Sequence, residues 1–248
     1  MQTDAAGWLR RWEAQQLLHV PDREERFSAI IDALVAFAGA APRVLDLGCG
    51  PGSLSARVLE RLPRAEIAAI DSDPVLLAIG RDALRSLPRL HFVDADLRTD
   101  WMARLPISPP FDAAVSTTAL HWLDLPDLVR LFRSLATALR PGGVLLNGDR
   151  LEFAHDQAVI ARMAEIIQPN WPEAPEGVED YGAWWEAAEA EPAFAQAVAE
   201  RRSRHVDHPH DNPGHTYAFY RAALLAAGFT EVGTIWQRVV NRVLVAVR

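Results

Sequence analysis

The run VLDLGCGPG, residues 44–52, carries the clearest chemical signal in the chain. A mostly apolar strand ends in three glycines at alternate positions, Gly48, Gly50 and Gly52, and a helix is predicted to begin near Ser53. Glycine allows sharp turns and lets a ligand approach the backbone where a Cβ would exclude it. In an open α/β sheet, ligands bind where a strand ends and faces a helix N-terminus. The run therefore predicts a cofactor-binding loop.

Two acidic residues at later strand ends indicate an adenosine group in the ligand. Asp71 ends the run IAAID, where a carboxylate can accept hydrogen bonds from both ribose hydroxyls. Asp96, in VDADL, could accept a hydrogen bond from an adenine amino group. Taken singly, Asp71 could instead cap the following helix, and Asp96 could be a turn residue. Ser53 stands where the dinucleotide motif needs glycine or alanine, which disfavours a NAD-dependent enzyme.

His121 is the candidate acid–base residue. It follows the fourth predicted strand, in the run FDAAVSTTALHWL, and precedes Trp122. Imidazole titrates near neutral pH, so a histidine at this edge of the sheet could accept a proton from a bound substrate. The alternative is that His121 packs against the cofactor loop and only shapes the site.

Short strands that alternate with helices must position these residues. Amphipathic helices are predicted at 7–18 and 23–38. The pattern that follows has strands at 44–47, 67–70, 90–93, 111–116 and 143–147, and helices at 54–62, 74–87 and 128–139. This alternation predicts a doubly wound α/β fold, in which helices cover both faces of a parallel sheet.

The alternation breaks after residue 150. Residues 151–213 are typical of helices separated by turns that contain proline and tryptophan, and a helix is predicted at 215–227. Strands at 229–236 and 239–247 are joined too tightly for a crossover helix, so they should form an antiparallel hairpin. We predict one domain whose parts are cap helices at 1–42, a cofactor-binding core at 43–150, a helical lid at 151–213 and a last helix with a hairpin at 214–248.

Composition narrows the possible chemistry. The chain has 248 residues and a net charge of -8, and all of its basic residues are arginines. Without lysine, Schiff-base chemistry and a P-loop lysine are excluded. The single cysteine, Cys49, excludes an intramolecular disulfide and predicts a reducing compartment. With no long apolar run and an acidic balance, we expect a cytoplasmic protein without membrane or nucleic-acid partners.

Five motifs, taken in order, resemble the class I methyltransferases that use S-adenosylmethionine. They are VLDLGCGPG, the acidic end of IAAID, VDADL, the strand with ALHWL, and LRPGGVLL, and they cover about residues 43–149. ALHWL and the ending AGFTEV are similar to the small-molecule group that includes trans-aconitate methyltransferase. The resemblance implies a Rossmann-like sheet of seven strands with the last strand antiparallel.

The resemblance also implies cofactor contacts. The methionine moiety would be lined by the first motif, through Asp46, Gly48, Cys49, Gly50 and Gly52. The remaining contacts would be Asp71 and Ser72 at the ribose, Asp96 and Leu97 at the adenine, Ser116 beneath the sulfonium and Arg26 at the methionine carboxylate.

Aromatic residues of the predicted lid are candidates for the acceptor site. Aromatics over the strand ends could form an apolar pocket that excludes water, or they could be the lid's own small core. The candidates are Trp171, Tyr181 and Trp185 of the lid, together with Trp122, His215 and Tyr217 outside it. Another cluster, His205, His208, His210 and His215, matches no familiar metal spacing, so we expect no metal site there.

The expected function is transfer of a methyl group from S-adenosylmethionine to an oxygen or nitrogen of a small organic molecule. A carboxylate acceptor is included, since Arg150 or Arg204 could orient it. The run that would replace ALHWL in base-modifying enzymes, NPPY or a close variant, is missing, which disfavours nucleic acid bases. Two alternatives stay open: methylation of a peptide or protein side chain, and a non-catalytic protein that binds the cofactor. The acceptor and the oligomeric state are left open.

Overall fold

The computed structural model describes residues 4–20, 22–167, 176–204 and 214–248. Two helices come first, α1 (Ala5–His19) and α2 (Arg23–Ala38). The Asp4 side chain caps α1 by accepting a hydrogen bond from the Gly7 backbone, and α2 ends at Gly39, whose φ is 74°. Both helices predicted at the start of the chain are therefore present.

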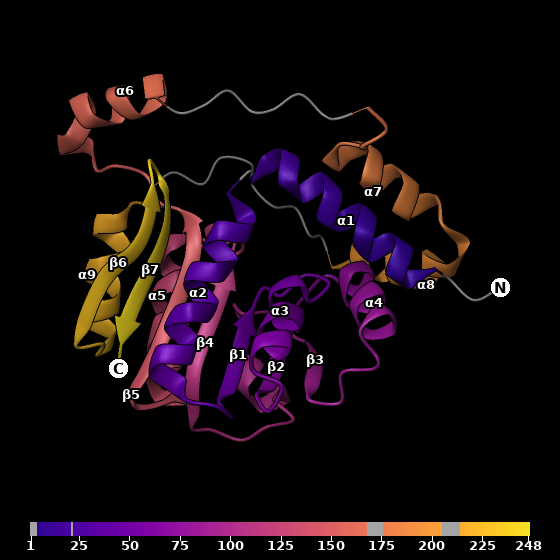
Figure 1. The fold of residues 1–248 in the computed structure, drawn as a ribbon, viewed down its shortest axis with the longest axis horizontal. Helices are drawn as coiled ribbons and strands as arrows, with labels where there is room; N and C mark the ends of the chain where they lie inside the picture. The colour runs from indigo at the N-terminus through magenta and orange to yellow at the C-terminus, as the bar shows by residue number, and fades with distance from the viewer. Residues whose placement is uncertain (1–3, 21, 168–175, 205–213) are drawn as a thin grey trace.

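Seven strands form one sheet in the order β3-β2-β1-β4-β5-β7-β6 (Figure 1). Their bounds are β1 (Arg43–Leu47), β2 (Glu66–Asp71), β3 (Leu90–Asp94), β4 (Phe111–Thr117), β5 (Leu139–Arg150), β6 (Glu231–Arg238) and β7 (Asn241–Val247). The first five pair in parallel, and β7 is antiparallel to both β5 and β6. The predicted fold class, with its antiparallel last strand, is confirmed.

Alternating side chains along the strands build a core on each face of the sheet. On one face, Val44 and Ile67 pack with α2 and with α3 (Ser53–Arg61). On the other, Leu45 and Ala68 belong to a core shared with α5 (Leu125–Ala138) and α9 (Tyr217–Ala227). This double cover fixes the strand ends, so the residues that follow them are held in place.

Local signals explain where the helices of the core begin. The Asp73 side chain caps α4 (Pro74–Ala83) by accepting hydrogen bonds from two backbone N–H groups. The Asp124 side chain caps α5 by accepting a hydrogen bond from one backbone N–H group. Gly52, with a φ of 87°, turns the chain from the first strand into α3. Each of these helices starts at the carboxyl edge of the sheet, where ligands bind in such folds.

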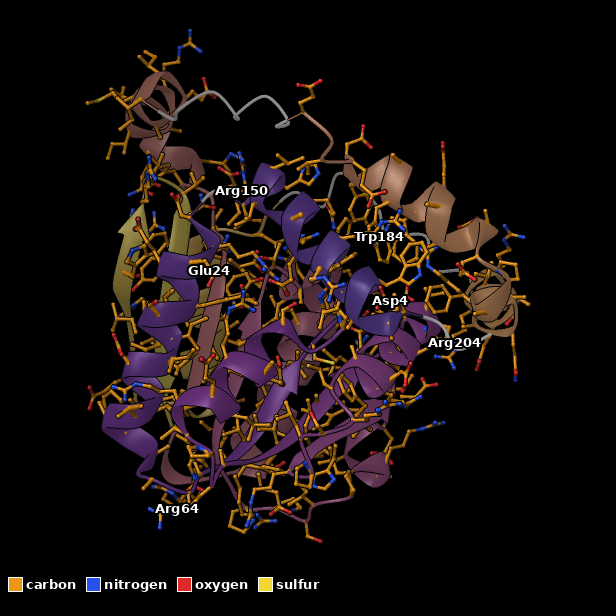
Figure 2. All side chains as sticks on the ribbon, turned by 45° about the vertical axis from the view of Figure 1, so that its right-hand side comes forward. Asp4, Glu24, Arg64, Arg150, Trp184 and Arg204 are labelled. Atoms are coloured by element: carbon orange, nitrogen blue, oxygen red, sulfur yellow. The ribbon has the colours of Figure 1, made fainter. Side chains whose placement is uncertain are left out.

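The predicted lid contains α6 (Ala158–Ile167), α7 (Tyr181–Ala190) and α8 (Ala195–Ser203). Two of these, α7 and α8, pack with α1 and α4 through a third hydrophobic cluster. Figure 2 shows Trp184 of α7 facing α1, where its ring lies 4.9 Å from that of Trp12. The helix α6 stands apart from the sheet (Figure 1) and exposes apolar side chains such as Val159. Within the described residues, no helix has both the length and the apolar character to cross a membrane.

Candidate functional site

A cavity of about 780 Å³ lies at the carboxyl ends of β1 to β4. Many of the predicted cofactor residues line it: Asp46, Gly48, Cys49, Gly50, Asp71, Ser72, Asp96 and Leu97. Three of the predicted acceptor residues line it too: Trp122, Tyr181 and Trp185. The volume is within the range of small-molecule sites. The structure thus brings together residues from three strand ends, the loop after β4 and the lid helix α7.

The glycine loop turns its backbone toward this cavity. The N–H groups of Gly48 and Cys49 both donate to the carbonyl of Ile70, at 2.9 and 3.0 Å, which ties the loop to β2. Gly50 has a φ of 54°, and a Cβ added there would meet only a methyl carbon of Leu76, at 3.9 Å. A side chain at position 50 would therefore occupy cavity space that a ligand could use.

At the other two positions, close packing leaves no room for a side chain. A Cβ at Gly48 would lie 2.4 Å from the Cβ of Ala119, so glycine is required where the β1 and β4 loops touch. At Gly52 it would lie 2.8 Å from the ring of Phe92, and Gly52 does not line the cavity. One motif therefore serves two purposes, ligand access at Gly50 and close contact at Gly48 and Gly52.

Asp71 connects the glycine loop to the next strand. Its carboxylate accepts from the N–H of Gly50 at 2.7 Å and from the N–H of Asp73 at 2.8 Å. Burial raises the pKa of Asp71 to about 6, against the effect of these hydrogen bonds, which favour the ionised form. At neutral pH, Asp71 is thus an ionised acceptor in the cavity wall.

Asp46 is the second buried carboxylate. Only 1% of it is exposed, and it accepts a hydrogen bond of 2.6 Å from the hydroxyl of Ser55. Burial raises the pKa of Asp46 to about 7, and repulsion by Asp71 acts in the same direction. A cation bound in the cavity would favour the ionised form of Asp46.

Besides Gly52, two more of the predicted cofactor residues, Ser116 and Arg26, do not line the cavity. Ser116 is fully buried and donates to the carbonyl of Leu47 at 2.7 Å. The guanidinium of Arg26 donates to the carbonyl of Gly148 at 3.0 Å, and neither residue lines the cavity. Arg23 does line the cavity, one helical turn before Arg26, and it pairs there with Glu13. Sequence reasoning indicated Arg26 and not Arg23, because periodicity alone does not set the exact rotation of a helix about its axis.

Sequence reasoning did not find the role of two lid arginines at the end of α8. Arg201 pairs with Asp73 at 2.7 Å and lies over the ring of Trp185, 3.9 Å from its centroid. Arg204 pairs with both carboxylate oxygens of Asp94, at 2.6 and 2.8 Å, and holds the pKa of that carboxyl below its usual range. These pairs fasten the end of α8 to the residues at the ends of β2 and β3. The only sequence signal for them was the basic run RRSR.

His121, in the short helix η2 (Leu120–Trp122), does not line the cavity, although its neighbours Ala119 and Trp122 do. Its Nδ1 is 2.8 Å from a carboxylate oxygen of Asp149, and its ring is 4.8 Å from that of Trp122, which lines the cavity. Burial alone lowers the pKa of His121, but the charge and hydrogen bond of Asp149 outweigh it, and the pKa is raised. The sequence had not indicated Asp149 as a partner.

The remaining candidates lie elsewhere or outside the described residues. His215 is buried and lies 2.9 Å from the hydroxyl of Tyr220, and Tyr217 packs against Arg242; neither His215 nor Tyr217 lines the cavity. Outside the described residues are Trp171, His205, His208 and His210. Within the described part of the chain, no three His, Cys, Asp or Glu side chains are grouped as a metal site requires.

Known proteins are similar to this chain in the region that contains the cavity-lining strand ends. Residues 44–143 match the family described as a methyltransferase domain. A trans-aconitate 2-methyltransferase of Azoarcus sp. is 39% identical over 134 residues, which is 54% of this chain and 49% of that protein. A trans-aconitate 2-methyltransferase of Escherichia coli is 37% identical over 134 residues, which is 54% of this chain and 49% of that protein. The chain thus spans about half the length of the curated relatives it matches.

Solved structures agree on the fold. The methyltransferase SibL has a TM-score of 0.58 at 19% identity, over 93% of this chain and 56% of SibL. Human N-acetylserotonin methyltransferase, solved in complex with S-adenosylmethionine, has a TM-score of 0.56 at 18% identity, over 96% of this chain and 56% of that chain. Residues 44–143 thus match a methyltransferase domain, and the chain is similar to the trans-aconitate 2-methyltransferases, as its motifs indicated.

Proposed function

We propose that this protein is a methyltransferase that uses S-adenosylmethionine to methylate a small organic molecule. The observation that carries the proposal is the pairing of Gly50 and Asp71 in the cavity wall. Gly50 leaves its face of the loop open, and its N–H holds the Asp71 carboxylate at 2.7 Å. The backbone at Gly50 leaves room for the methionine part of the cofactor, and the ionised Asp71 beside it could accept hydrogen bonds from the ribose hydroxyls.

The residues present fit the whole cofactor. Asp71, with Ser72, would accept the ribose hydroxyls, while Asp96 and Leu97 would flank the adenine. Asp46 would face the positively charged methionine moiety, which suits a carboxyl whose pKa of about 7 lets it ionise readily near a cation. In place of Arg26, the geometry favours Arg23 as the partner of the methionine carboxylate, since Arg23 is the one that lines the cavity.

When bound, the cofactor supplies a methyl group activated by its attachment to a sulfonium. The protein's task is then to align an acceptor and to exclude water, and no covalent catalyst is required. Helices α1, α7 and α8 can perform both tasks, because Trp12, Tyr181 and Trp185 form an aromatic wall on the cavity. We propose that these helices act as a lid on one domain.

The lining of the cavity supports a small acceptor. The cavity is bounded by aromatic side chains on one side and by Thr117, Thr118 and Trp122 on the other. A site of this kind leaves room for a small molecule beside the cofactor. We place the reaction in the cytoplasm, where the single thiol, Cys49, would stay reduced.

Production of adenosylhomocysteine tests the proposal. The protein is incubated with S-adenosylmethionine and a panel of small hydroxyl, amine and carboxylate compounds, with peptides as a separate arm. We expect turnover with at least one small compound and none with peptides. Tight cofactor binding without turnover would favour a non-catalytic binder, and turnover with peptides alone would favour a protein-modifying enzyme.

A further inference from the structure

The arginines around the cavity bear on the charge of the methyl acceptor. Every arginine of the chain lies within the described residues. Five of them line the cavity: Arg23, Arg98, Arg104, Arg201 and Arg204. Arg150, which the sequence suggested as a partner for a carboxylate acceptor, does not line the cavity and pairs with Glu152. An anionic acceptor would therefore depend on the five lining arginines.

Carboxylates of the protein already pair with the two lining arginines of α8 and its C-terminal end. Arg201 pairs with Asp73, after β2, at 2.7 Å. Arg204 holds both oxygens of Asp94, at the end of β3, at 2.6 and 2.8 Å. A carboxylate acceptor would have to take one of these arginines and leave its present partner unpaired, which costs free energy.

The other three lining arginines are also engaged. Arg98 pairs with Asp96 at 2.7 Å, and Arg23 pairs with Glu13. Arg104 is exposed, and it donates to a backbone carbonyl at the end of β3 at 3.3 Å. Four of the five arginines thus lie around the ends of β2 and β3, where the ribose and adenine of the cofactor are proposed to bind, and Arg23 is assigned to the methionine carboxylate.

Uncharged side chains line the cavity beside the glycine loop. The loop after β4 contributes Thr117, Thr118 and Ala119 to the wall. Ala119 packs so closely on Gly48 that a Cβ there would lie 2.4 Å from its own. The hydroxyl oxygens of Thr117 and Thr118 lie 3.4 Å apart, and a hydroxyl can donate or accept a hydrogen bond. This part of the wall therefore suits a polar group without charge.

The wall formed by α1 and α7 continues the same character. Trp12, Gln16 and His19 of α1 line the cavity at spacings of four and three residues, which places them on one face of the helix. The ring of Tyr181 of α7 lies 6.3 Å from that of Trp12 and 6.1 Å from that of His19. His19 is exposed, so water and salt would screen any charge on it. This wall offers aromatic rings and one amide.

We propose that the methyl acceptor is an uncharged molecule with a flat aromatic body. This inference rests on the proposed function, because the cofactor would occupy the end of the cavity that holds the paired arginines. The rings of Trp12 and Tyr181 would pack against the body of the acceptor, and such ring pairs are favourable beyond the area they bury. Thr117, Thr118 and Gln16 would bind its polar groups. A carboxylate there would lose water to hydroxyl and amide groups, which offset the cost only in part.

Matched probes, titrated into the protein saturated with adenosylhomocysteine, test the inference. Each pair shares an aromatic body and differs in charge: para-hydroxybenzamide with para-hydroxybenzoate, and a hydroxynaphthamide with the corresponding hydroxynaphthoate. Propane tricarboxylate is the anionic probe without a ring. Calorimetry at neutral pH, where the acids are ionised, measures each Kd. We expect at least one amide to bind about 10-fold more tightly than its acid, and the tricarboxylate to bind most weakly.

A pair of variants tests where the acceptor lies. Gln16→Arg adds a positive charge to the wall assigned to the acceptor. Leu17→Arg adds the same charge at the next position of α1, which is exposed and does not line the cavity. We expect Gln16→Arg to bind the aromatic acids about 10-fold more tightly than the wild type does, with the Kd of adenosylhomocysteine unchanged. Leu17→Arg should keep the wild-type preference for amides.

Three results would overturn the inference. Tighter binding of the acids than of the amides by the wild type would contradict an uncharged acceptor, and binding of no aromatic probe would contradict an aromatic one. Equal acid affinities in Gln16→Arg and Leu17→Arg would contradict the position beside α1. If Gln16→Arg no longer binds adenosylhomocysteine, the wild-type pairs still decide the charge class. Failure of the wild type to bind adenosylhomocysteine would contradict the proposed function itself, and is observed before any acceptor probe is added.

Discussion

At the scale of single residues, the site contains carboxylates whose burial costs folding free energy. Asp46 and Asp71 end neighbouring strands and repel one another, and burial raises the pKa of the first to about 7 and of the second to about 6. A folded protein under no functional constraint would gain by neutralising them. A bound ligand with a positive charge and hydroxyl donors would stabilise the ionised form of both carboxylates.

Asp46→Asn should therefore stabilise the empty protein above neutral pH. A raised carboxyl pKa means that the ionised form disfavours folding, so the penalty is fully present above pH 7 and is lost as the pH falls toward 4. We expect the variant to gain about 1–3 kcal/mol in free energy of unfolding at pH 8 and much less at pH 5. Denaturant titrations at both pH values measure it.

The control is Asp32→Asn, a change at an exposed carboxyl on α2. Its effect on stability should be small at both pH values. An Asp46→Asn variant that is less stable than the wild type at pH 8 would show that the Ser55 hydrogen bond outweighs the buried charge.

At the scale of elements, α7 and α8 are fastened by contacts between distant parts of the sequence. Trp8 and Trp12 of α1 pack against Trp184 of α7, with ring centroids 5.7 and 4.9 Å apart. Figure 2 shows Arg204 at the opposite end of the lid, where it reaches Asp94 at the end of β3. Tyr181 and Trp185, which were candidates for acceptor contact, also pack against Trp12, with ring centroids 6.3 and 6.4 Å away.

Arg204→Gln tests whether α8 forms part of the cofactor wall. The change removes a bidentate ion pair to Asp94 and a hydrogen bond of 2.8 Å to the carbonyl of Ser72. Because the pair is partly exposed, we expect a modest effect, a rise in cofactor Kd of about 3- to 10-fold. Calorimetric titration measures it, with Arg133→Gln, an exposed change on α5, as the control. Equal Kd values for both variants would contradict a role for α8 in the wall.

Sequence alone predicted the elements whose signals are local. The strand, glycine turn and helix from Arg43 to Arg61 follow from an apolar run and from glycine conformations, and both can be recognised within a few residues. The positions of Arg23, Arg201 and Arg204 depend on helix rotation and on partners far away in the chain, so no local pattern could indicate them. Asp149 was missed for the same reason, since its partner His121 lies on another strand's loop.

At the scale of the whole molecule, strand order determines where the site can be. The chain passes from β1 outward to β2 and β3, and then returns to place β4 on the other side of β1. Loops after strands on either side of this reversal diverge and leave a crevice, which is where such sheets bind ligands. The cavity occupies this position, with the lid helices above it.

Calorimetric titration with adenosylhomocysteine tests the central claim most directly. We predict that the wild-type protein binds one molecule per chain and does not bind NAD. Asp71→Asn should bind adenosylhomocysteine about 10- to 100-fold more weakly, because hydrogen bonds to a charged acceptor contribute about 1.5–3 kcal/mol, and Asp32→Asn should bind as the wild type does. Absence of binding to the wild type, or equal affinity in Asp71→Asn, would contradict the claim that this cavity holds the adenosyl cofactor.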